Sequence, residues 1–375
     1  MNPLSFFALS IILNVKPVSN FSNTGGSEIC RPFNFNLNQK HKMSEKRFSI
    51  NDRKLINGPV NNLMQIRPVK YAWAMQLLEQ QQNNAWDQRE VDLSEDAKQY
   101  AMGHLTDGNL NSYKKALAFL SNLDGIQLNN LTKNIGKYIT SPEVSMCITR
   151  QAWEEAQHVL SYAQIIESIG FDPDEIYWMF DTDPVLAEKN EYITRSSEIL
   201  GSGFSEENFV KAVVANIALE GIYFFNGFLT FYTLERQGLM KNSAKMIQLI
   251  QKDEEAHLHL FINMWKTLRL EIPHVFTEKL IEECRELIQL AVQHEIAWGK
   301  YIIQDGVLGL TDTIVEGFIQ SLADKRLDSI GLEPMYNVKN PIPWFDDASK
   351  VNLGETNFFE GKNASYAAGG SLEWD

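Results

Sequence analysis

The sequence predicts an all-α protein built as a helical bundle. Apolar residues recur at helical spacing through long stretches, the connections between them are short and turn-like, and no alternating run is long enough for a sheet. Residues 170–174 and 202–205 are typical of such turns. The expected helices span residues 69–82, 95–123, 143–168, 184–200, 206–236, 240–269, 276–304 and 309–330.

The two ends of the chain differ in composition from the part between them. Residues 1–42 are rich in Asn, Ser, Phe and Gly without helical period, so we expect a disordered leader or a start assigned too early, with Met43 as the true start. We expect one helical domain over residues 43–335. Residues 336–375 are expected to form an extended tail, because Pro and Gly interrupt them.

One expected helix is apolar on all sides. Residues 210–231 are long enough to cross a membrane, yet they contain Lys211, Asn216, Glu220 and Asn226. A helix of this kind belongs in the centre of a bundle when its polar residues have a functional role. We therefore expect a buried helix and no membrane span.

Composition and charge exclude several classes of function. The chain has 375 residues, of which 44% are hydrophobic, and a formal net charge of −14. Its basic residues form no run or stripe, so nucleic acid is not an expected partner. Cys30, Cys147 and Cys284 are isolated, which favours a reducing compartment, and the cytoplasm is the expected location.

Two Glu-x-x-His pairs carry the chemistry. Glu155 and His158 lie in one helical pattern, and Glu254 and His257 repeat the spacing in another. Residues three apart project from one face of a helix, so each pair can bind one metal ion. A single pair would be an ordinary feature of a solvated helix face, but two pairs on separate helices predict a dinuclear site.

Such a site needs one more carboxylate from each of two further helices, the ligand plan of ferritin-like dimetal carboxylate proteins. Glu220 is the one acid in an otherwise apolar run, where a buried charge needs a metal or a partner. Asp124 ends an apolar helical run, a place where acids are more often solvated or capping, and only its place in the set favours it. Tyr162 follows Glu155 by two helical turns, so it lies on the ligand face.

With these residues in view, the chain resembles the small, radical-generating subunit of class I ribonucleotide reductase. The resemblance covers about residues 65–375 and implies a ferritin-like helical bundle. Its motifs, which are specific as a set, are Trp86 followed by Glu90-Val-Asp-Leu-Ser, Leu123-Asp-Gly-Ile-Gln, Glu155-x-x-His158-x-x-x-Tyr162, Leu219-Glu-Gly-Ile, Lys252-Asp-Glu-Glu-Ala-His, Asn340-Pro-Ile-Pro-Trp, and Tyr366 after Phe358-Phe-Glu.

The resemblance implies two metal ions and a radical. The ions would be two irons per subunit, or manganese, because carboxylates with imidazole suit both. With dioxygen they would oxidise Tyr162 to a tyrosyl radical, and a pocket of Phe224, Phe228 and Ile250 would preserve it. One ion would be held by Asp124, Glu155 and His158 and the other by Glu220, Glu254 and His257, with one or more glutamates bridging.

The resemblance also implies partners. The oxidising equivalent would pass through Trp86, with Asp253 linking the indole to a metal-bound histidine, and then through Tyr366 to the large subunit, where ribonucleotides are reduced. Leu372 and Trp374 are apolar anchors by which the tail would dock on that subunit. We also expect a homodimer, and an external thiol reductant that acts on the large subunit.

Three features refine the resemblance. Gln88 stands where the family usually has a proline two residues after Trp86. Residues 1–66 contain no recognisable nucleotide-binding cone, so no allosteric nucleotide site is expected on this chain. The retained Tyr162 argues against the subgroup that stores its oxidant in a manganese-iron pair, but it does not separate di-iron from dimanganese enzymes.

Two alternatives from other classes stay open. A ferritin-like iron store, or another non-catalytic iron-binding protein, would need the carboxylates but neither a tyrosine relay nor an anchored tail. A ferritin-like oxidase acting on a small molecule or lipid would need a substrate channel to the metals.

Overall fold

The described part of the chain is helical throughout. The computed structural model describes residues 49–60, 64–201 and 203–348. All of them belong to the compact unit Arg47–Asp375, and within them no strand occurs beyond one isolated bridge between Ile56 and Ile139. The expected all-α class is confirmed. The expectations for residues 1–42 and for the end of the tail lie outside the described residues.

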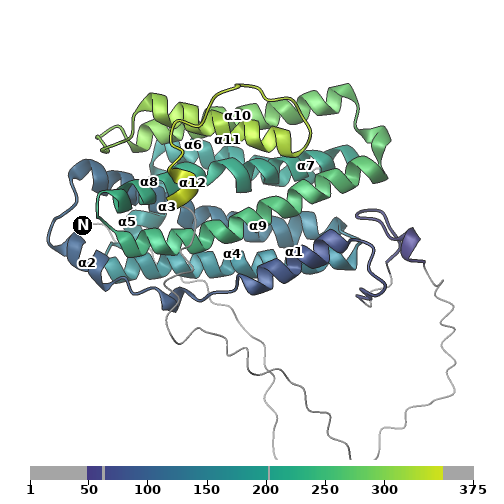
Figure 1. Ribbon diagram of the computed structural model, residues 1–375, viewed down its shortest axis with the longest axis horizontal. Coiled ribbons are helices and arrows are strands. Elements are labelled where there is room, and N and C mark those ends of the chain that lie inside the picture. The colour runs from purple at the N-terminus through teal and green to yellow at the C-terminus, as the bar shows by residue number, and fades with distance from the viewer. Residues whose placement is uncertain (1–48, 61–63, 202, 349–375) are drawn as a thin grey trace, which may run out of the picture. The chain divides into compact units, whose positions relative to one another are not determined.

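Long helices lie side by side in this unit (Figure 1). Two π-helical turns, η3 (Leu131–Ile135) and η6 (Leu219–Tyr223), interrupt or extend them. The α-helices are α1 (Ala72–Asn83), α2 (Ser94–Ala101), α3 (Asp107–Asn130), α4 (Pro142–Ile169), α5 (Pro173–Thr182), α6 (Pro184–Ser197), α7 (Glu206–Ala218), α8 (Phe225–Arg236), α9 (Lys241–Glu271), α10 (Glu278–Ile302), α11 (Asp312–Ser329) and α12 (Phe345–Ala348).

The expected helix over residues 95–123 is two helices, α2 and α3. Gly103 has a φ of +68°, which takes the chain out of the helical conformation after α2. Thr106 then caps α3, because its side chain accepts a hydrogen bond from Asn109 N. This break makes α3 a separate helix that continues past residue 123 to Asn130.

The connection expected around residues 170–174 contains the start of an additional helix, α5. Gly170, with a φ of +87°, does end α4. Asp172 then caps α5 by accepting a hydrogen bond from Asp174 N, and Pro173 occupies the first turn, where its missing N–H is tolerated. Asp172 and Pro173, which suggested a turn, therefore mark the beginning of a helix.

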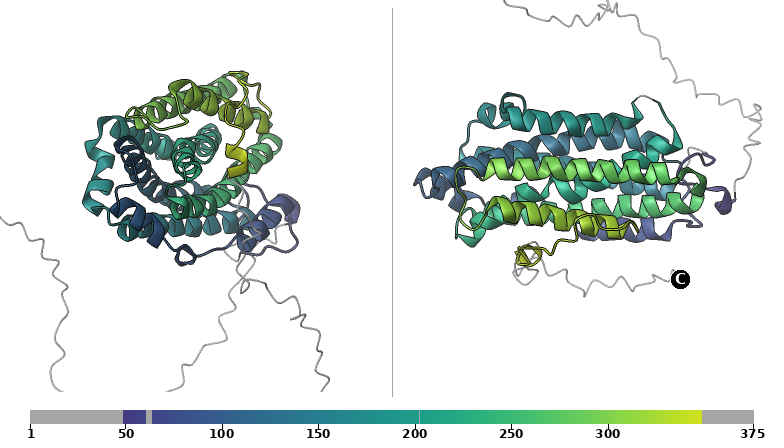
Figure 2. Two further views of the ribbon diagram at one scale, coloured as in Figure 1. Left: turned by 60° about the vertical axis from the view of Figure 1, so that its left-hand side comes forward. Right: turned by 90° about the horizontal axis from the view of Figure 1, so that it is seen from above.

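The apolar segment expected to be buried lies at the centre of the bundle. Helices α7 and α8 are joined through η6 into one continuous rod, and Figure 2 (left) shows this rod end-on inside a ring of other helices. Residues 206–236 are long and apolar enough to cross a membrane, yet 94% of their most apolar window is buried inside the protein. The prediction of a core helix is confirmed.

The packed structure continues beyond residue 335. The Phe345 ring on α12 is buried against Tyr232 and Phe318, with ring centroids 5.3 and 4.8 Å apart. The Asp324 carboxylate of α11 accepts hydrogen bonds from the backbone N–H groups of Met335 and Tyr336, at 2.8 and 3.0 Å. The first residues of the expected tail therefore lie on the bundle.

A buried aspartate fixes the start of α9, the helix that carries Glu254 and His257. Its N-cap residue, Met240, has a φ of +49° and makes no capping bond with its side chain. Asp96 of α2 supplies the acceptor instead, from Asn242 N at 3.2 Å, Ser243 N at 2.6 Å and Ser243 Oγ at 2.7 Å. A carboxylate here satisfies free N–H groups and interacts favourably with the helix dipole.

Replacing Asp96 should therefore destabilise the fold. Asp96→Ala leaves buried N–H groups without an acceptor, so we expect the free energy of unfolding to fall by about 2–3 kcal/mol. Urea denaturation followed by circular dichroism measures this loss. Glu95→Ala in the same helix removes only an exposed ion pair with Lys98 and should change stability by less than about 0.5 kcal/mol. Equal effects of the two substitutions would contradict the capping role.

Candidate metal centre

Four segments of the bundle each contribute to one buried cluster of acids and histidines. All six side chains are at most 1% exposed. Asp124 lies inside α3, well before its end at Asn130, and not at the helix end that the sequence suggested. The cluster comprises Asp124 from α3, Glu155 and His158 from α4, Glu220 from η6, and Glu254 and His257 from α9.

The six side chains form two overlapping groups. Within each group one ligand atom from every residue lies within 4.8 Å of the others. Glu155 and Glu254 belong to both groups, so these two carboxylates are placed to bridge two ions. The first group is Asp124, Glu155, His158 and Glu254, and the second is Glu155, Glu220, Glu254 and His257.

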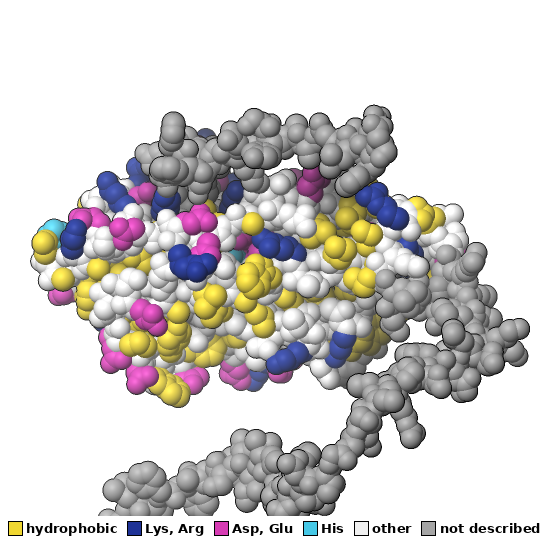
Figure 3. Space-filling model, turned by 90° about the horizontal axis from the view of Figure 1, so that it is seen from below, with side chains coloured by type: hydrophobic (Ala, Val, Ile, Leu, Met, Phe, Trp, Pro, Cys, Tyr) yellow, Lys and Arg dark blue, Asp and Glu magenta, His cyan; other side chains and the backbone are white. Residues whose placement is uncertain are grey.

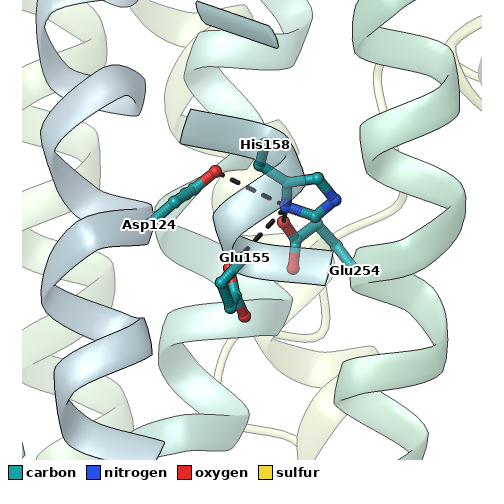
Figure 4. A group of neighbouring side chains, drawn as sticks. All are labelled: Asp124, Glu155, His158 and Glu254. Carbon is teal, nitrogen blue, oxygen red and sulfur yellow. Dashed lines mark ion pairs between the residues drawn. The ribbon is translucent and has the colours of Figure 1, made fainter. Parts of the chain in front are cut away.

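Both histidines turn the Nδ1 atom into the cluster. His158 Nδ1 lies 3.0 Å from Glu254 Oε1, 3.5 Å from Asp124 Oδ2 and 3.7 Å from Glu155 Oε2 (Figure 4). His257 Nδ1 lies 2.8 Å from Glu254 Oε2 and 3.3 Å from Glu155 Oε1. Each nitrogen thus faces carboxylate oxygens that come from different helices.

The donor atoms fit two divalent cations. Asp124 Oδ1 and Oδ2, His158 Nδ1 and Glu220 Oε2 are buried and have no partner in hydrogen-bond geometry among the described residues, and the same holds for Glu155 Oε2 and Glu254 Oε1, although His158 Nδ1 lies 3.0 to 3.7 Å from three of these oxygens. Leaving buried polar atoms unbonded is costly, so their gathering at one place indicates a ligand. Four carboxylates carry four negative charges, which two divalent ions would neutralise.

The pKa values of the clustered carboxyl groups and histidines are shifted because these groups are buried close together. Burial raises the pKa of Asp124 and of Glu220 well above the usual range of a carboxyl group. Burial by itself would lower the pKa of His158 and His257, but the surrounding carboxylates, Glu254 first, raise it well above its usual value. Burial also acts to raise the pKa of Glu254, but the charges of His257 and His158 outweigh it and lower the pKa. These shifts favour positive charge on the two histidines among the carboxylates.

A carboxylate contacts the outer nitrogen of each histidine. Asp253 Oδ2 lies 3.3 Å from His158 Nε2 and accepts a hydrogen bond from Trp86 Nε1 at 2.7 Å. Glu154 Oε2 lies 3.0 Å from His257 Nε2. Such partners fix the tautomer and the orientation of a ligand histidine.

Sequence reasoning missed the polar residues that support the cluster. Gln151 Nε2 donates to Glu220 Oε1 at 2.8 Å and to Glu155 Oε1 at 3.1 Å, and Gln127 Nε2 also donates to Glu220 Oε1. Glu154, which the sequence analysis did not single out, is 2% exposed. The one available signal was position, because Gln127 and Gln151 precede or follow expected ligands by about one helical turn.

Tyr162 is fully buried beside the cluster. Its hydroxyl makes no hydrogen bond with any described residue. Burial raises the pKa of its phenol well above the usual value, and the charge of Asp124 adds to this effect. The expected pocket residues Phe224, Phe228 and Ile250 are also fully buried, and the two phenylalanine rings stack with centroids 5.7 Å apart.

Trp86 is partly exposed and is linked to the cluster through Asp253. Its ring is half-buried and stacks near the His158 ring, with centroids 6.3 Å apart. Gln88, which replaces the family's usual proline, ties the segment to α4: its side chain accepts from Gln157 Nε2, and its carbonyl accepts from Gln164 Nε2 at 3.1 Å. Tyr366, the next expected member of the relay, lies outside the described residues, as do Leu372 and Trp374.

Comparisons with known proteins identify the family. The family model of the ribonucleotide reductase small chain matches residues 63–341. The β subunit of ribonucleoside-diphosphate reductase from Treponema pallidum is 34% identical over 330 residues, which is 86% of this chain and 93% of that protein.

Solved structures show the same fold. The R2 subunit of ribonucleotide reductase from Clostridium botulinum is 40% identical, with a TM-score of 0.76 over 80% of this chain and 95% of that one. The dimanganese(II)-NrdF structure from Streptococcus sanguinis is 21% identical, with a TM-score of 0.67 over 78% and 99% of the two chains. The resemblance noted in the motifs is confirmed, and the chain belongs to the ribonucleotide reductase small chain family.

Proposed function

We infer that this chain is the small subunit of a ribonucleoside-diphosphate reductase and that it generates and stores a radical on Tyr162. The observation that carries this proposal is the convergence of six ligand side chains beside a buried phenol, with Trp86 joined to ligand His158 through Asp253. An iron store does not need the connection from His158 through Asp253 to Trp86. That connection therefore favours the reductase over the ferritin-like alternatives.

Iron or manganese would be held by the two overlapping groups, because carboxylate oxygens and imidazole suit both metals. A pair of such ions supplies, with dioxygen, the oxidising power that removes an electron from a phenol. The proposed bridging ligands are Glu155 and Glu254. Asp253 and Glu154 hold the two ligand histidines in the tautomer that presents Nδ1 to the ions.

The surroundings of Tyr162 would give its radical a long life. The phenol is fully buried and its pKa is well raised, so the hydroxyl is protonated before oxidation. Phe224, Phe228 and Ile250 are buried hydrocarbon side chains that would keep water and reductants away.

The proposed transfer path runs from the centre to the large subunit. His158, Asp253 and Trp86 form its inner part, and Tyr366 in the tail would continue it. We propose that the tail docks on the large subunit and that the external thiol reductant acts there. The cytoplasm remains the proposed location, in keeping with the free thiols of Cys147 and Cys284.

A homodimer is the proposed assembly, and the outer side of α4 supports it. Trp153 and Leu160 are 58% and 52% exposed and, seven residues apart, lie on the same side of the helix. Figure 3 shows hydrophobic side chains gathered among charged ones on the face seen from below. A second copy of the chain would cover such side chains.

Tyr162→Phe should separate metal binding from the radical. The variant keeps all six ligands, so we expect an unchanged content of iron or manganese, no tyrosyl signal in electron paramagnetic resonance, and no ribonucleotide reduction. Tyr232→Phe is the matched control, because Tyr232 is equally buried but its hydroxyl donates to Gln251 at 2.8 Å. Continued reduction by Tyr162→Phe would mean that another group stores the oxidant.

Trp86→Phe should separate radical formation from radical transfer. Phenylalanine keeps an aromatic ring but cannot donate to Asp253, so we expect the Tyr162 signal to form and turnover with the large subunit to be lost. Tyr366→Phe should behave in the same way. Trp178→Phe, at an exposed position of α5, should leave turnover unchanged. Normal turnover in the Trp86 variant would remove Trp86 from the path.

Metal binding should release protons. His158, His257, Asp124 and Glu220 have raised pKa values in the metal-free cluster, so cations must displace protons from them. Raising the pH removes these protons, and the affinity for Mn²⁺ should rise at least about tenfold per pH unit between about pH 6 and 8. Titration calorimetry in buffers of different ionisation enthalpy measures the proton count, and a pH-independent affinity would contradict this assignment.

A further inference from the structure

The ligand Glu220 lies on an irregular turn of the central rod. Residues Leu219–Tyr223 form the π-helical turn η6 between α7 and α8. A π-helical turn changes the spacing of backbone hydrogen bonds, and such turns are frequent at functional sites. Side chains from neighbouring helices form hydrogen bonds with two buried backbone groups here, the Gly221 carbonyl and the Asn226 N–H.

A side chain from α11 donates a hydrogen bond to a backbone carbonyl group of the turn. Arg326 Nε donates to the Gly221 carbonyl oxygen at 3.0 Å. A Cβ atom at position 221 would lie 2.7 Å from Arg326 Nε, so glycine is what permits this approach. Burial lowers the pKa of Arg326 to about 10, which leaves the guanidinium charged at neutral pH.

A carboxylate from α10 accepts a hydrogen bond from a backbone N–H group just after the turn. Glu295 Oε1 accepts from Asn226 N at 3.2 Å, and the Glu295 carbonyl accepts from Asn226 Nδ2 at 2.7 Å. Asn226 is the second residue of α8, so these bonds fix the point at which the rod returns to α-helix.

A buried lysine from α6 holds Glu295 in place. Lys189 Nζ contacts Glu295 Oε2 and lies 3.5 Å from the centroid of the Phe119 ring and 5.3 Å from that of Trp298. Burial lowers the pKa of Lys189 to about 8, so the amine is mostly protonated at neutral pH. A buried ion pair contributes little net stability compared with apolar residues of similar volume, so a role in positioning accounts for it better.

We propose that Glu295 and Arg326 are positioning residues that clamp the η6 turn and thereby place the Glu220 carboxylate in the metal centre, while Lys189 neutralises the buried charge of Glu295. Two helices that supply none of the six ligands, α10 and α11, thus determine the geometry of one ligand. The proposal rests on the proposed role of Glu220 as a metal ligand. It predicts that the ion shared by Glu220 and His257 depends on the clamp more than the other ion does.

Two double variants of nearly equal volume test the clamp. Lys189→Met with Glu295→Gln removes both charges but keeps an acceptor for Asn226 N, whereas Lys189→Met with Glu295→Leu removes the acceptor too. Metal-free full-length protein is titrated with Mn²⁺. We expect the Gln variant to bind two ions with an exchange-coupled paramagnetic resonance signal. The Leu variant should bind the second ion about 10–100-fold more weakly and show the six-line signal of an isolated ion.

Controls separate the clamp from general stability. Ile288→Ala makes a cavity in α10 two turns from Glu295 and should lower the melting temperature without uncoupling the ions. Glu283→Leu removes the partly exposed pair with Lys211, also between α10 and the central rod, and should bind two coupled ions. Equal metal binding by the two double variants would overturn the clamp. Failure of the unaltered protein to bind two coupled ions would instead overturn the proposed metal function.

Discussion

The burial of four carboxylates at one point in the bundle is the constraint on which the rest of this structure depends. Their mutual repulsion and lost hydration would destabilise the fold, so positive charge must lie among them. Without metal, the carboxylates outweigh burial and raise the pKa of His158 and His257, which favours the positively charged imidazoles. With metal, two divalent ions would supply the positive charge and leave the site neutral. The cluster is therefore already shaped, in its protonated form, for what it is proposed to bind.

The two histidines have similar inner contacts and different outer ones. The carboxylate on His158 leads to the indole of Trp86, an oxidisable group at the edge of the bundle. The carboxylate on His257, from Glu154, leads to Gln81 and Arg150, whose side chains do not carry an unpaired electron. The two ligand groups are nearly symmetric, but only the His158 side reaches an oxidisable side chain, and this difference supports the proposed direction of transfer.

Regular helices hold most of the proposed metal-binding side chains in place, and one irregular turn supplies the remaining one. Five of the six proposed ligands come from α3, α4 and α9, where packing fixes the backbone. Glu220 comes from the π-helical turn of a rod that is buried on all sides. Arg326 and Glu295 reach backbone groups at that turn from outside the rod, at the Gly221 carbonyl and the Asn226 N–H. The η6 turn and the two side chains that bond to it, Arg326 and Glu295, therefore belong together structurally.

The sequence by itself determined the helical class, the central apolar rod and the two Glu-x-x-His pairs, because helical periodicity and residue spacing are local properties of the chain. Asp124 and Glu220 followed from the ligand plan that two such pairs require. It could not show the break between α2 and α3, the helix start at Pro173, or the burial of Glu154, which depend on capping and on what packs against each face. The supports from Gln127 and Glu295 were equally hidden. Residues that are far apart in sequence become partners only when helices pack, and only the tertiary structure decides which buried polar atoms meet.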